Sequence, residues 1–411
     1  MTNTDIDTGS TVALQLLSAA AVRERCRQIL TASAELEHFR VHMDRLDNVA
    51  DYVIETIREN YPDMNVPFHS RWRHFKFAGV DRWKDIARTL DADADEIARI
   101  QFDIAVTSVF LDAGAGPRWS YSDTRTGARY TRSEGLALAS LDSIARGLFS
   151  SSTDGIPTAE AAALQAIACD DLAAAFQVTR DNPLDGLDGR ARLLRSLGKA
   201  VAAKPEFFSA QTPRIGCLYD WIKRTHGDAI EAADLLTSVL HAFGGIWAGR
   251  LEIDGVNLGD TWHHPAARAA DKTDGLVPFH KLSQWLAYSL IEPLQDAGIR
   301  VTGVDGLTGL AEYRNGGLFV DMGVLEVKNL GLLEQAHNPG DLLIIEWRAL
   351  TVALLDETAV IVRNKLGCTA QELPLASILE GGTWAAGRRI AAHLRPNAGP
   401  PIRIVSDGSV F

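Results

Sequence analysis

The stretch DLLIIEWRALTVALLDETAVIVRNKLG, residues 341–367, decides the fold class. Apolar residues fill it with helical spacing, and no proline interrupts it. Gly367 follows the last periodic residue, where a helix commonly ends in a left-handed glycine. The stretch predicts a long helix over Asp341–Leu366 with Gly367 as its C-cap.

Segments on the N-terminal side of this stretch repeat the helical pattern, with few strand signals between them. Helices are predicted at residues 11–31 (with Thr11 as N-cap), 47–60, 94–112, 134–149, 157–178, 187–203, 228–248 and 277–297. RWSYSDTRTGARYTR (118–132) alternates around a turn and predicts a β-hairpin. Residues 400–411 predict two short strands joined at Asp407–Gly408. The predicted fold class is mainly α.

The domain organisation follows from the absence of repeats, low-complexity linkers and charge blocks. Residues 1–10 are predicted to be a loose tail, and residues 11–411 one large helical domain. RDNPLDGLDGR (180–190) is the point where a sub-domain break would fall. Residues 254–276 predict a long loop, a kind of segment that is often functional.

Composition excludes several classes of function. The 41 basic residues stand against 53 acidic ones, for a formal net charge of −12. The basic groups are scattered, which disfavours nucleic acid as a partner and leaves a small molecule or a protein. No apolar run reaches the roughly 18 residues of a membrane span, and the polar start lacks a secretory pattern. These features predict a cytoplasmic protein.

The cysteines, Cys26, Cys169, Cys217 and Cys368, lie far apart and form no metal-ligand spacing. They are interpreted as reduced thiols. The adjacent histidines of TWHHP (261–265) point in different directions in a helix or strand, and no acidic cluster accompanies them. The sequence predicts no metal and no cofactor.

Asp103 is the only ionisable residue in FDIAVTSVFL (102–111). A carboxylate in so apolar a helix must be paired, hydrogen-bonded or protonated. It is either a structural carboxylate, bonded by a backbone N–H or an arginine, or a site carboxylate on a rigid helix. The loop that follows, LDAGAGPRW (111–119), is bracketed by Asp112 and Trp119. It is either a ligand-binding loop or a plain helix-to-hairpin connection.

Cations alternate with aromatic residues in VPFHSRWRHFKFAGVDRW (66–83). Such a pattern suits a planar ligand or an anion, or else an amphipathic segment whose arginines pair with acids. The candidate ligand-binding residues here are His69, Arg71, Arg73 and His74. His280, which opens PFHKLSQWL, is a further candidate, with a surface or capping histidine as the alternative.

AEYRNGGLFVDMG (311–323) concentrates polar chemistry beside an apolar run. Its candidate residues are Glu312, Tyr313, Arg314, Asn315 and Asp321. The glycine pair indicates a tight turn or a close backbone approach to a ligand or helix. The segment lines a site, or it is a polar loop that caps the following helix.

Four long motifs carry a resemblance: VPFHSRWRHF…GVDRW, LDAGAGPRW…RSEGLALASLDSIARGLFSS, LTGLAEYRNGGLFVDMGVL and LEGGTWAAGRRIAAHLRP…PPIRIVSDGSVF. In this order they resemble the fungal uracil-catabolism family of Urc-four and Urg-three type, across nearly the whole chain. The resemblance implies a role in a pyrimidine route that opens the uracil ring while it is still attached to ribose. A ribosylurea-type intermediate must then be split into urea and a ribose product.

A second similarity joins FDIAVTSVFLDAGAGPRWSYSDTRTGARYTRSEGLALASL and the Glu312-Tyr313-Arg314 loop to the queuosine nucleoside hydrolase family. It implies a fold resembling the helical DNA glycosylases. That family has Asp where this chain has Glu312, and the glycine pair and Asp321 are peculiar to this chain. Queuosine itself is therefore not the expected substrate.

Together the resemblances imply a metal-independent N-glycosidase acting on a nucleoside- or nucleotide-derived substrate. Glu312 would act at the sugar or on the attacking water, with Asp103 or Asp321 as the second carboxylate. Asp321 could instead only hold Arg314. Tyr313, Arg314 and Asn315 would orient the urea or ribose. The cations of residues 69–74 would hold a 5′-phosphate, if one is present, and Trp119 would form a wall.

Other functions remain open on the sequence. The chain could be a hydrolase of another pyrimidine-derived nucleoside or nucleotide, or a phosphorolytic transferase. It could also be a non-catalytic sensor or a partner of the ring-opening enzyme.

Overall fold

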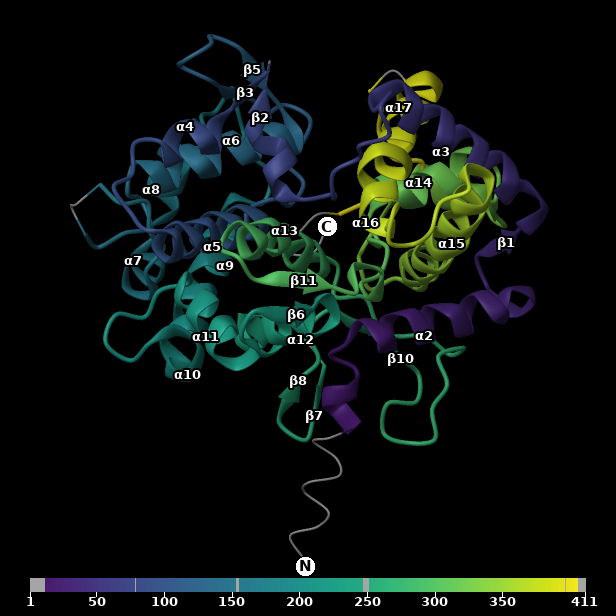
Figure 1. Cartoon of the computed structure of the whole chain (residues 1–411). Helices are drawn as coiled ribbons and strands as arrows, with labels where there is room; N and C mark the ends of the chain where they lie inside the picture. Colours follow the sequence, from purple (N-terminus) through teal and green to yellow (C-terminus); the bar gives the residue numbers. More distant parts are fainter. Residues whose placement is uncertain (1–11, 78, 153–154, 247–250, 396, 406–411) are drawn as a thin grey trace, which may run out of the picture. The chain divides into compact units, whose positions relative to one another are not determined.

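The computed structural model describes residues 12–77, 79–152, 155–246, 251–395 and 397–405. Helices predominate, and the strands are short and pair two at a time (Figure 1). The prediction of a mainly α protein is confirmed. The described residues fall into two compact units. The first is drawn from Met1–His69, Gly249–Gln284 and Gly303–Val405, and the second from Ser70–Ala248 and Trp285–Thr302.

The first unit is built around α15 (Leu342–Leu366), the helix of the opening motif. Every residue from Leu343 to Leu355 is buried, so this half of the helix is surrounded on all sides, as a central helix must be. It packs against α2 (Ala19–Thr31), α3 (Leu46–Asn60) and α14 (Tyr313–Asp321). It ends at Gly367, whose φ of 68° is left-handed, as predicted.

The remaining elements of the first unit are shorter. Its strand pairs are β1 (Phe39–Val41) with β12 (Leu325–Val327), β7 (Glu252–Ile253) with β8 (Val256–Asn257), β9 (Thr261–His263) with β10 (Leu276–Pro278), and β13 (Ala336–His337) with β14 (Arg403–Ile404). Its further helices include α16 (Leu375–Ser377), α17 (Trp384–Leu394), the π-helix η7 (Ile378–Thr383) and the 3-10 helices η1 (Ser33–Glu35), η2 (Met43–Arg45), η5 (Val304–Gly306) and η6 (Leu330–Glu334). The predicted long loop at 254–276 is therefore partly strand.

The second unit is built around α5 (Ala94–Phe110), which is buried almost continuously from Ala98 to its end. Around it lie η3 (Arg71–Phe75), α4 (Arg82–Ala87), α6 (Arg132–Ala145), α7 (Ala161–Ala166), α8 (Cys169–Ala175), α9 (Leu187–Ala203), α10 (Pro205–Phe208), α11 (Cys217–His226), α12 (Ala232–Phe243) and most of α13 (Lys281–Asp296). Its strand pairs are β2 (Lys76–Phe77) with β3 (Val80–Asp81), β4 (Tyr121–Ser122) with β5 (Arg129–Tyr130), and β6 (Ala229–Glu231) with β11 (Arg300–Thr302).

Most predicted helices are present. Three predictions differ from the structure: the 157–178 helix, the start of the first helix and the pairing of the C-terminal strands. The 157–178 helix is split, because the carboxylate of Asp171 accepts from the Ala168 N–H and begins a new helix. The predicted 11–31 helix is interrupted at residues 16–18, and Ser18 caps its second part, α2, through an Oγ that accepts from Ala21 N. Thr11 lies outside the described residues. β14 pairs with β13, whereas the predicted turn at Asp407–Gly408 also lies outside them.

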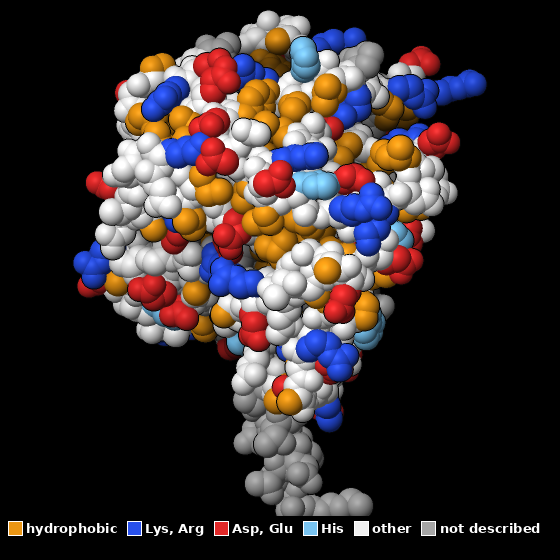
Figure 2. Space-filling model, turned by 90° about the vertical axis from the view of Figure 1, so that its right-hand side faces the viewer, with side chains coloured by type: hydrophobic (Ala, Val, Ile, Leu, Met, Phe, Trp, Pro, Cys, Tyr) orange, Lys and Arg blue, Asp and Glu red, His pale blue; other side chains and the backbone are white. Residues whose placement is uncertain are grey.

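The β4–β5 hairpin lies within the predicted 118–132. A single domain from residue 11 to residue 411 stays a prediction. No helix of the described ranges combines the length and the apolarity needed to cross a membrane. On the face that Figure 2 shows, acidic and basic side chains are interspersed.

The glycine pair of the EYRNGG motif lies inside α14, not in a turn. A Cβ on Gly316 would come within 2.7 Å of the Trp347 indole and of Thr351 Oγ1 on α15. A Cβ on Gly317 would lie 3.2 Å from Pro401. Gly316 and Gly317 therefore allow close packing of protein on protein, and the space beside them holds side chains rather than a ligand.

Replacing Gly316 by Ala is expected to destabilise the protein by about 1–3 kcal/mol, because the added methyl group overpacks the α14–α15 contact. The measurement is the free energy of unfolding in denaturant. Gly244→Ala is the control, since Gly244 is helical and a Cβ added there would have no atom within 4 Å. Equal stability of the two variants would contradict this packing role.

Candidate functional site

Glu312 begins α14 as its N-cap. Its Oε1 accepts from the Asn315 N–H and its Oε2 from the Arg314 N–H, both at 2.6 Å. These donors are among the N–H groups that a helix start leaves without an intrahelical partner. The bonds fix both carboxylate oxygens in place, and the residue keeps an intermediate exposure.

Burial raises the pKa of Glu312. The two backbone N–H bonds and the nearby charges of Lys281 and Arg314 act in the opposite direction but do not outweigh it. A carboxylate with a raised pKa is a better base than an ordinary one and is suited to proton transfer closer to neutral pH.

Helix α14 runs parallel to the η7–α17 segment. Thr383 Oγ1, at the junction of η7 and α17, donates to Asn315 Oδ1 near the start of α14 at 2.8 Å, and Arg395 binds Asp321 at the ends of α17 and α14. The carbonyl of Arg314, the residue before Asn315, packs directly on Gly387, which follows Thr383 by about one turn. The N-terminal end of α14 therefore lies beside η7.

The π-helix η7 carries Glu380, whose Oε2 lies 2.6 Å from His69 Nδ1. The His69 ring in turn lies 5.6 Å from that of Trp384. π-Helical turns are rare and occur often at functional sites. Here the turn also brings Gly381 and Gly382 against side chains of α3 and its flank, where a Cβ would be within 2.7 Å of another carbon.

Glu312 lies one turn before Asn315, and Glu380 lies about one turn before Thr383. Since Asn315 and Thr383 are bonded to each other, both carboxylates belong to the same end of the helix pair. We call this group, Glu312 with the Glu380–His69 pair, the α14/η7 site. It offers a fixed carboxylate and an imidazole oriented by a second carboxylate.

The other residues of the motif are largely bonded within the protein. Asn315 is fully buried and donates to Leu310 O in addition to accepting from Thr383. Arg314 donates to Ala398 O, and its guanidinium lies 4.9 Å from the Tyr313 ring. Of these residues, Tyr313 alone keeps an intermediate exposure, so it is the one best placed to contact a ligand.

Asp321 holds Arg395, not Arg314 as one interpretation of the sequence had it. Both of its oxygens accept from the guanidinium, at 2.8 and 2.5 Å. The pair lies at the far end of α14 from Glu312. A catalytic role for Asp321 stays a prediction without geometric support.

Asp103 has the partners of a structural carboxylate. It is fully buried, and its oxygens accept from Arg214 Nε at 2.5 Å and from Gly216 N at 2.8 Å. Burial raises the pKa of Asp103 to about 7, against the charge of Arg214. For Arg214, burial lowers the pKa, but Asp103 and Glu96 together outweigh it.

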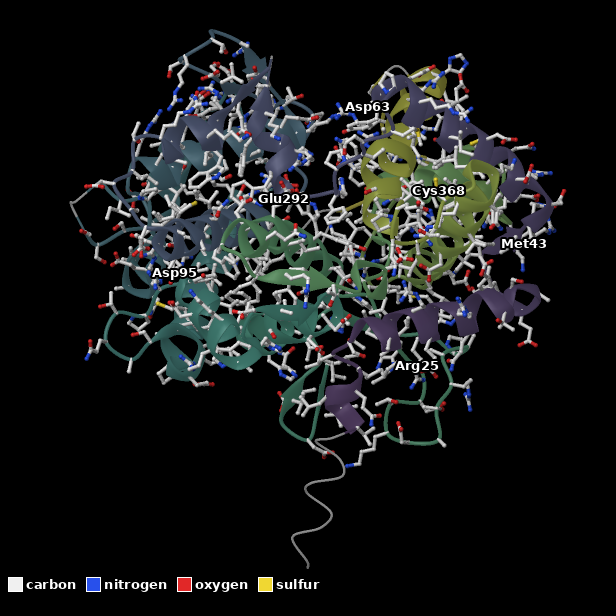
Figure 3. The ribbon with its side chains drawn as sticks, in the orientation of Figure 1. Arg25, Met43, Asp63, Asp95, Glu292 and Cys368 are labelled. Carbon is white, nitrogen blue, oxygen red and sulfur yellow. The ribbon has the colours of Figure 1, made fainter. Side chains whose placement is uncertain are left out.

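The four cations of residues 69–74 do not form one anion site. His69 is bound to Glu380 in the first unit, whereas the other three lie in the second. There Arg73 pairs with Glu292, which Figure 3 labels, and Arg71 with Asp112. His74 lies 3.4 Å from Arg71 through Nδ1 and packs on Trp285. Because carboxylates balance these charges, the structure offers no support for a phosphate site here.

Trp119 and His280 are interior residues. Trp119 is 1% exposed, stacks on Phe176 and donates to its carbonyl, so it packs in the core rather than forming a pocket wall. His280 directly precedes α13, and its carbonyl accepts from the Gln284 N–H, but its side chain does not cap the helix. It is buried, its Nε2 lies 2.9 Å from Leu16 O, and burial lowers its pKa. Asp260 Oδ2 instead accepts from the first N–H of α13.

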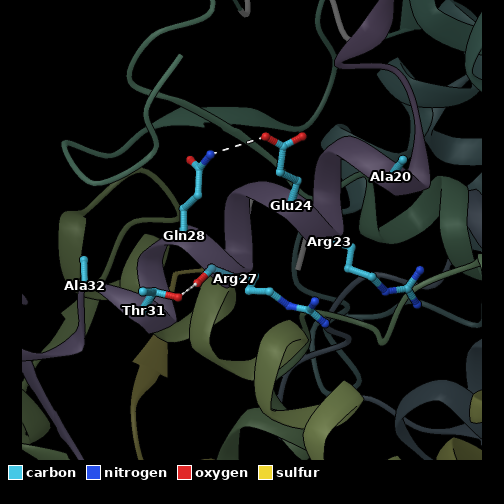
Figure 4. A pocket seen from close by; sticks show the side chains of 7 residues that line it. All are labelled: Ala20, Arg23, Glu24, Arg27, Gln28, Thr31 and Ala32. Atoms are coloured by element: carbon cyan, nitrogen blue, oxygen red, sulfur yellow. Dashed lines mark hydrogen bonds between the residues drawn. The ribbon is translucent and has the colours of Figure 1, made fainter.

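A surface groove of about 720 Å³ lies along α2. Figure 4 shows its lining: Ala20, Arg23, Glu24, Arg27, Gln28, Thr31 and Ala32. All come from one helix and its C-cap, and Arg23 is turned to Asp356 and three carbonyls. The groove therefore does not bring together polar or charged side chains from different elements. Within the described ranges, no three His, Cys, Asp or Glu side chains are grouped to hold a metal ion.

The sequence interpretation missed Glu380 as a site residue. The motif LEGGTWAAGRR contains Glu380, and its adjacent glycines signal close packing there. Nothing local in the sequence indicates that residue 380 meets residue 69, because the pairing depends on chain segments 311 residues apart.

Fold and site define a mainly helical protein that holds a fixed carboxylate and a carboxylate–imidazole pair at one end of two parallel helices. A family model described as "Protein of unknown function (DUF1688)" matches residues 15–411. The chain is 39% identical to "Protein urg3" of Schizosaccharomyces pombe, covering 97% of this chain and 98% of that protein. It is 36% identical to "Uracil catabolism protein 4" of Lachancea kluyveri, covering 96% and 98%. The chain belongs to this family.

The raised pKa of Asp103 predicts a pH-dependent stability. Between the ordinary value of 3.8 and about 7, the folded state holds a proton that the unfolded state has released. The stabilisation of the folded state by this proton is therefore complete below pH 3.8 and is lost as the pH rises through 7. The free energy of unfolding falls by up to about 1.4 kcal/mol per pH unit in this range. Asp103→Asn removes it.

The measurement is the free energy of unfolding of both proteins at several values between pH 4 and pH 8. The stability of the original protein relative to Asp103→Asn should fall across this window. A difference that does not change with pH would contradict the assignment.

Proposed function

We propose that the protein acts in uracil catabolism as an N-ribosidic hydrolase that splits a ribosylurea-type compound, with or without a 5′-phosphate, into urea and ribose or ribose phosphate. The name of the Lachancea kluyveri relative, "Uracil catabolism protein 4", supports the pathway. The observation that carries the reaction type is the Thr383–Asn315 bond, which places the helix start capped by Glu312 beside the π-helix that carries the Glu380–His69 pair.

The chemistry needs two groups of this kind. As the C1′–N bond breaks, positive charge develops on the sugar, and a carboxylate next to it stabilises that charge or takes a proton from the attacking water. Glu312 is our choice for this role, since its oxygens are fixed and its pKa is raised.

The leaving ureide nitrogen must receive a proton as the bond breaks. His69 is our choice of donor, because the 2.6 Å contact of its Nδ1 with Glu380 fixes the ring orientation. Water supplies the hydroxyl that bonds to C1′, the bond electrons stay on the nitrogen, and the proton completes urea. Tyr313 lies next to Glu312 and is placed to contact the substrate.

The first test is release of urea from ribosylurea, and from its 5′-phosphate, by the purified protein. Glu312→Gln should lower kcat by at least about 100-fold, and His69→Gln by about 10²–10⁴-fold. Glu312→Gln also weakens the N-cap by about 0.5–2 kcal/mol, so its fold is verified by circular dichroism.

Asp321→Asn is the matched comparison, because it alters the other end of the same helix. It should lower stability by breaking the pair with Arg395 while turnover per folded molecule is retained. Full activity of Glu312→Gln, or loss of activity in Asp321→Asn alone, would reject the proposed roles.

A second candidate is binding without turnover, as in a sensor or a partner of the ring-opening enzyme. The observation in its favour is that both Glu312 oxygens already accept backbone N–H bonds. Overnight incubation separates the two: a sensor leaves ribosylurea unchanged on chromatography. A phosphorolytic enzyme, by contrast, would turn over only with added phosphate.

A further inference from the structure

Arg71 is held rigidly inside the second unit. Its side chain is fully buried, and its Nε donates to Ser108 Oγ at 2.6 Å. Ser108 Oγ lies 2.6 Å from Ser140 Oγ, which donates to Ala137 O. This chain of hydrogen bonds fixes the plane of the guanidinium.

The guanidinium is only partly used. Its Nη1 lies 3.2 Å from Asp112 Oδ2 and 3.4 Å from Ser133 O. Within the described part of the chain, its Nη2 has no hydrogen-bond partner, and neither does Asp112 Oδ1. Two adjacent buried groups thus each present an unused atom, one a donor and the other an acceptor. Leaving such atoms without a partner costs free energy.

The surroundings select the kind of ligand. The Arg71 guanidinium carbon lies 5.4 Å from the Trp285 ring and 5.9 Å from the Phe75 ring, so planar apolar surfaces flank it. The charges of Arg71 and Asp112 cancel, which disfavours an anion such as phosphate. A neutral planar group that carries a C=O beside an N–H satisfies both unused atoms. The Asp112 side chain is 6% exposed, so solvent reaches this residue, although its unused Oδ1 is itself buried.

We propose that Arg71 and Asp112 form a binding site for a ureido group, in which Arg71 Nη2 donates to the ureide carbonyl and Asp112 Oδ1 accepts from its N–H. The choice of a ureide over another amide rests on the proposed function. The presence of an unused donor on Arg71 and an unused acceptor on Asp112 does not depend on that function. All of its residues belong to the second unit, so it is a further ureide site, made of residues other than those of the α14/η7 site. It replaces the phosphate role that the resemblance implied for Arg71 and gives Asp112 a defined one.

The test is calorimetric titration of the full chain with N-(2-hydroxyethyl)urea. This probe carries a ureido group and no glycosidic bond, so its binding does not depend on hydrolysis. Saturable binding is expected in the original protein, with at least a tenfold weaker affinity in Asp112→Asn and in Arg71→Lys. Arg71→Lys keeps the positive charge but lacks Nη2.

Asp123→Asn is the matched control. Asp123 also forms a buried pair with an arginine of this unit, Arg82, but both of its oxygens are bonded in the protein. It should bind the probe as the original protein does. Inorganic phosphate is titrated as the anion arm and should give no saturable binding.

Absence of saturable probe binding, equal affinity in Arg71→Lys, equal weakening by Asp123→Asn, or competition by phosphate would each overturn the ureide site. If Asp112→Asn does not fold, Arg71→Lys decides the question alone. Probe binding without urea release from ribosylurea would reject the proposed hydrolase and leave this site in place.

Discussion

The contact on which the candidate site depends is the packing of α14 between α15 and α17. Gly316 admits the Trp347 indole, and Gly387 admits the carbonyl of Arg314. Neither approach is compatible with a Cβ. Because the helices lie this close, Thr383 reaches Asn315 and sets the parallel register that brings Glu312 beside the π-helix of Glu380. Two glycines thus determine which chain segments lie together at the candidate site.

The ionisable groups in the interior serve different purposes, and their hydrogen-bond partners show which purpose each one serves. Asp103 and Asp321 each accept two bonds from groups that they hold in place. Glu312 is also doubly bonded, but by backbone N–H groups of its own helix, so its orientation is fixed without neutralisation by a bound guanidinium. Arg71 and Asp112 are paired yet incompletely bonded. Buried pairs of this last kind are costly to maintain for stability alone.

The local structure of this protein, above all the positions of its helices, could be predicted from the sequence. Helical periodicity placed α3, α5, α9 and α15 to within a residue or two at nearly every end, because the buried faces of these helices leave a regular apolar pattern. The split at residues 167–168 was missed, since it arises from one carboxylate that competes for a backbone N–H. The glycine pair was interpreted as a tight turn or as a close backbone approach to a ligand or a helix, and the structure shows the approach to a helix. The sequence left these alternatives open, because a glycine that permits helix packing looks the same in each case.

The sequence by itself determined the mainly α class, the central helix with its Gly367 cap, and the residue types available for chemistry, including Glu312, His69 and Asp112. Only the tertiary structure decided which of these meet. It pairs His69 with Glu380 and Arg71 with Asp112, so these two cations have different carboxylate partners. It also pairs Asp321 with Arg395. The physical reason is that pairing of buried charges depends on contacts between distant chain segments, which leave no periodic signal along the chain.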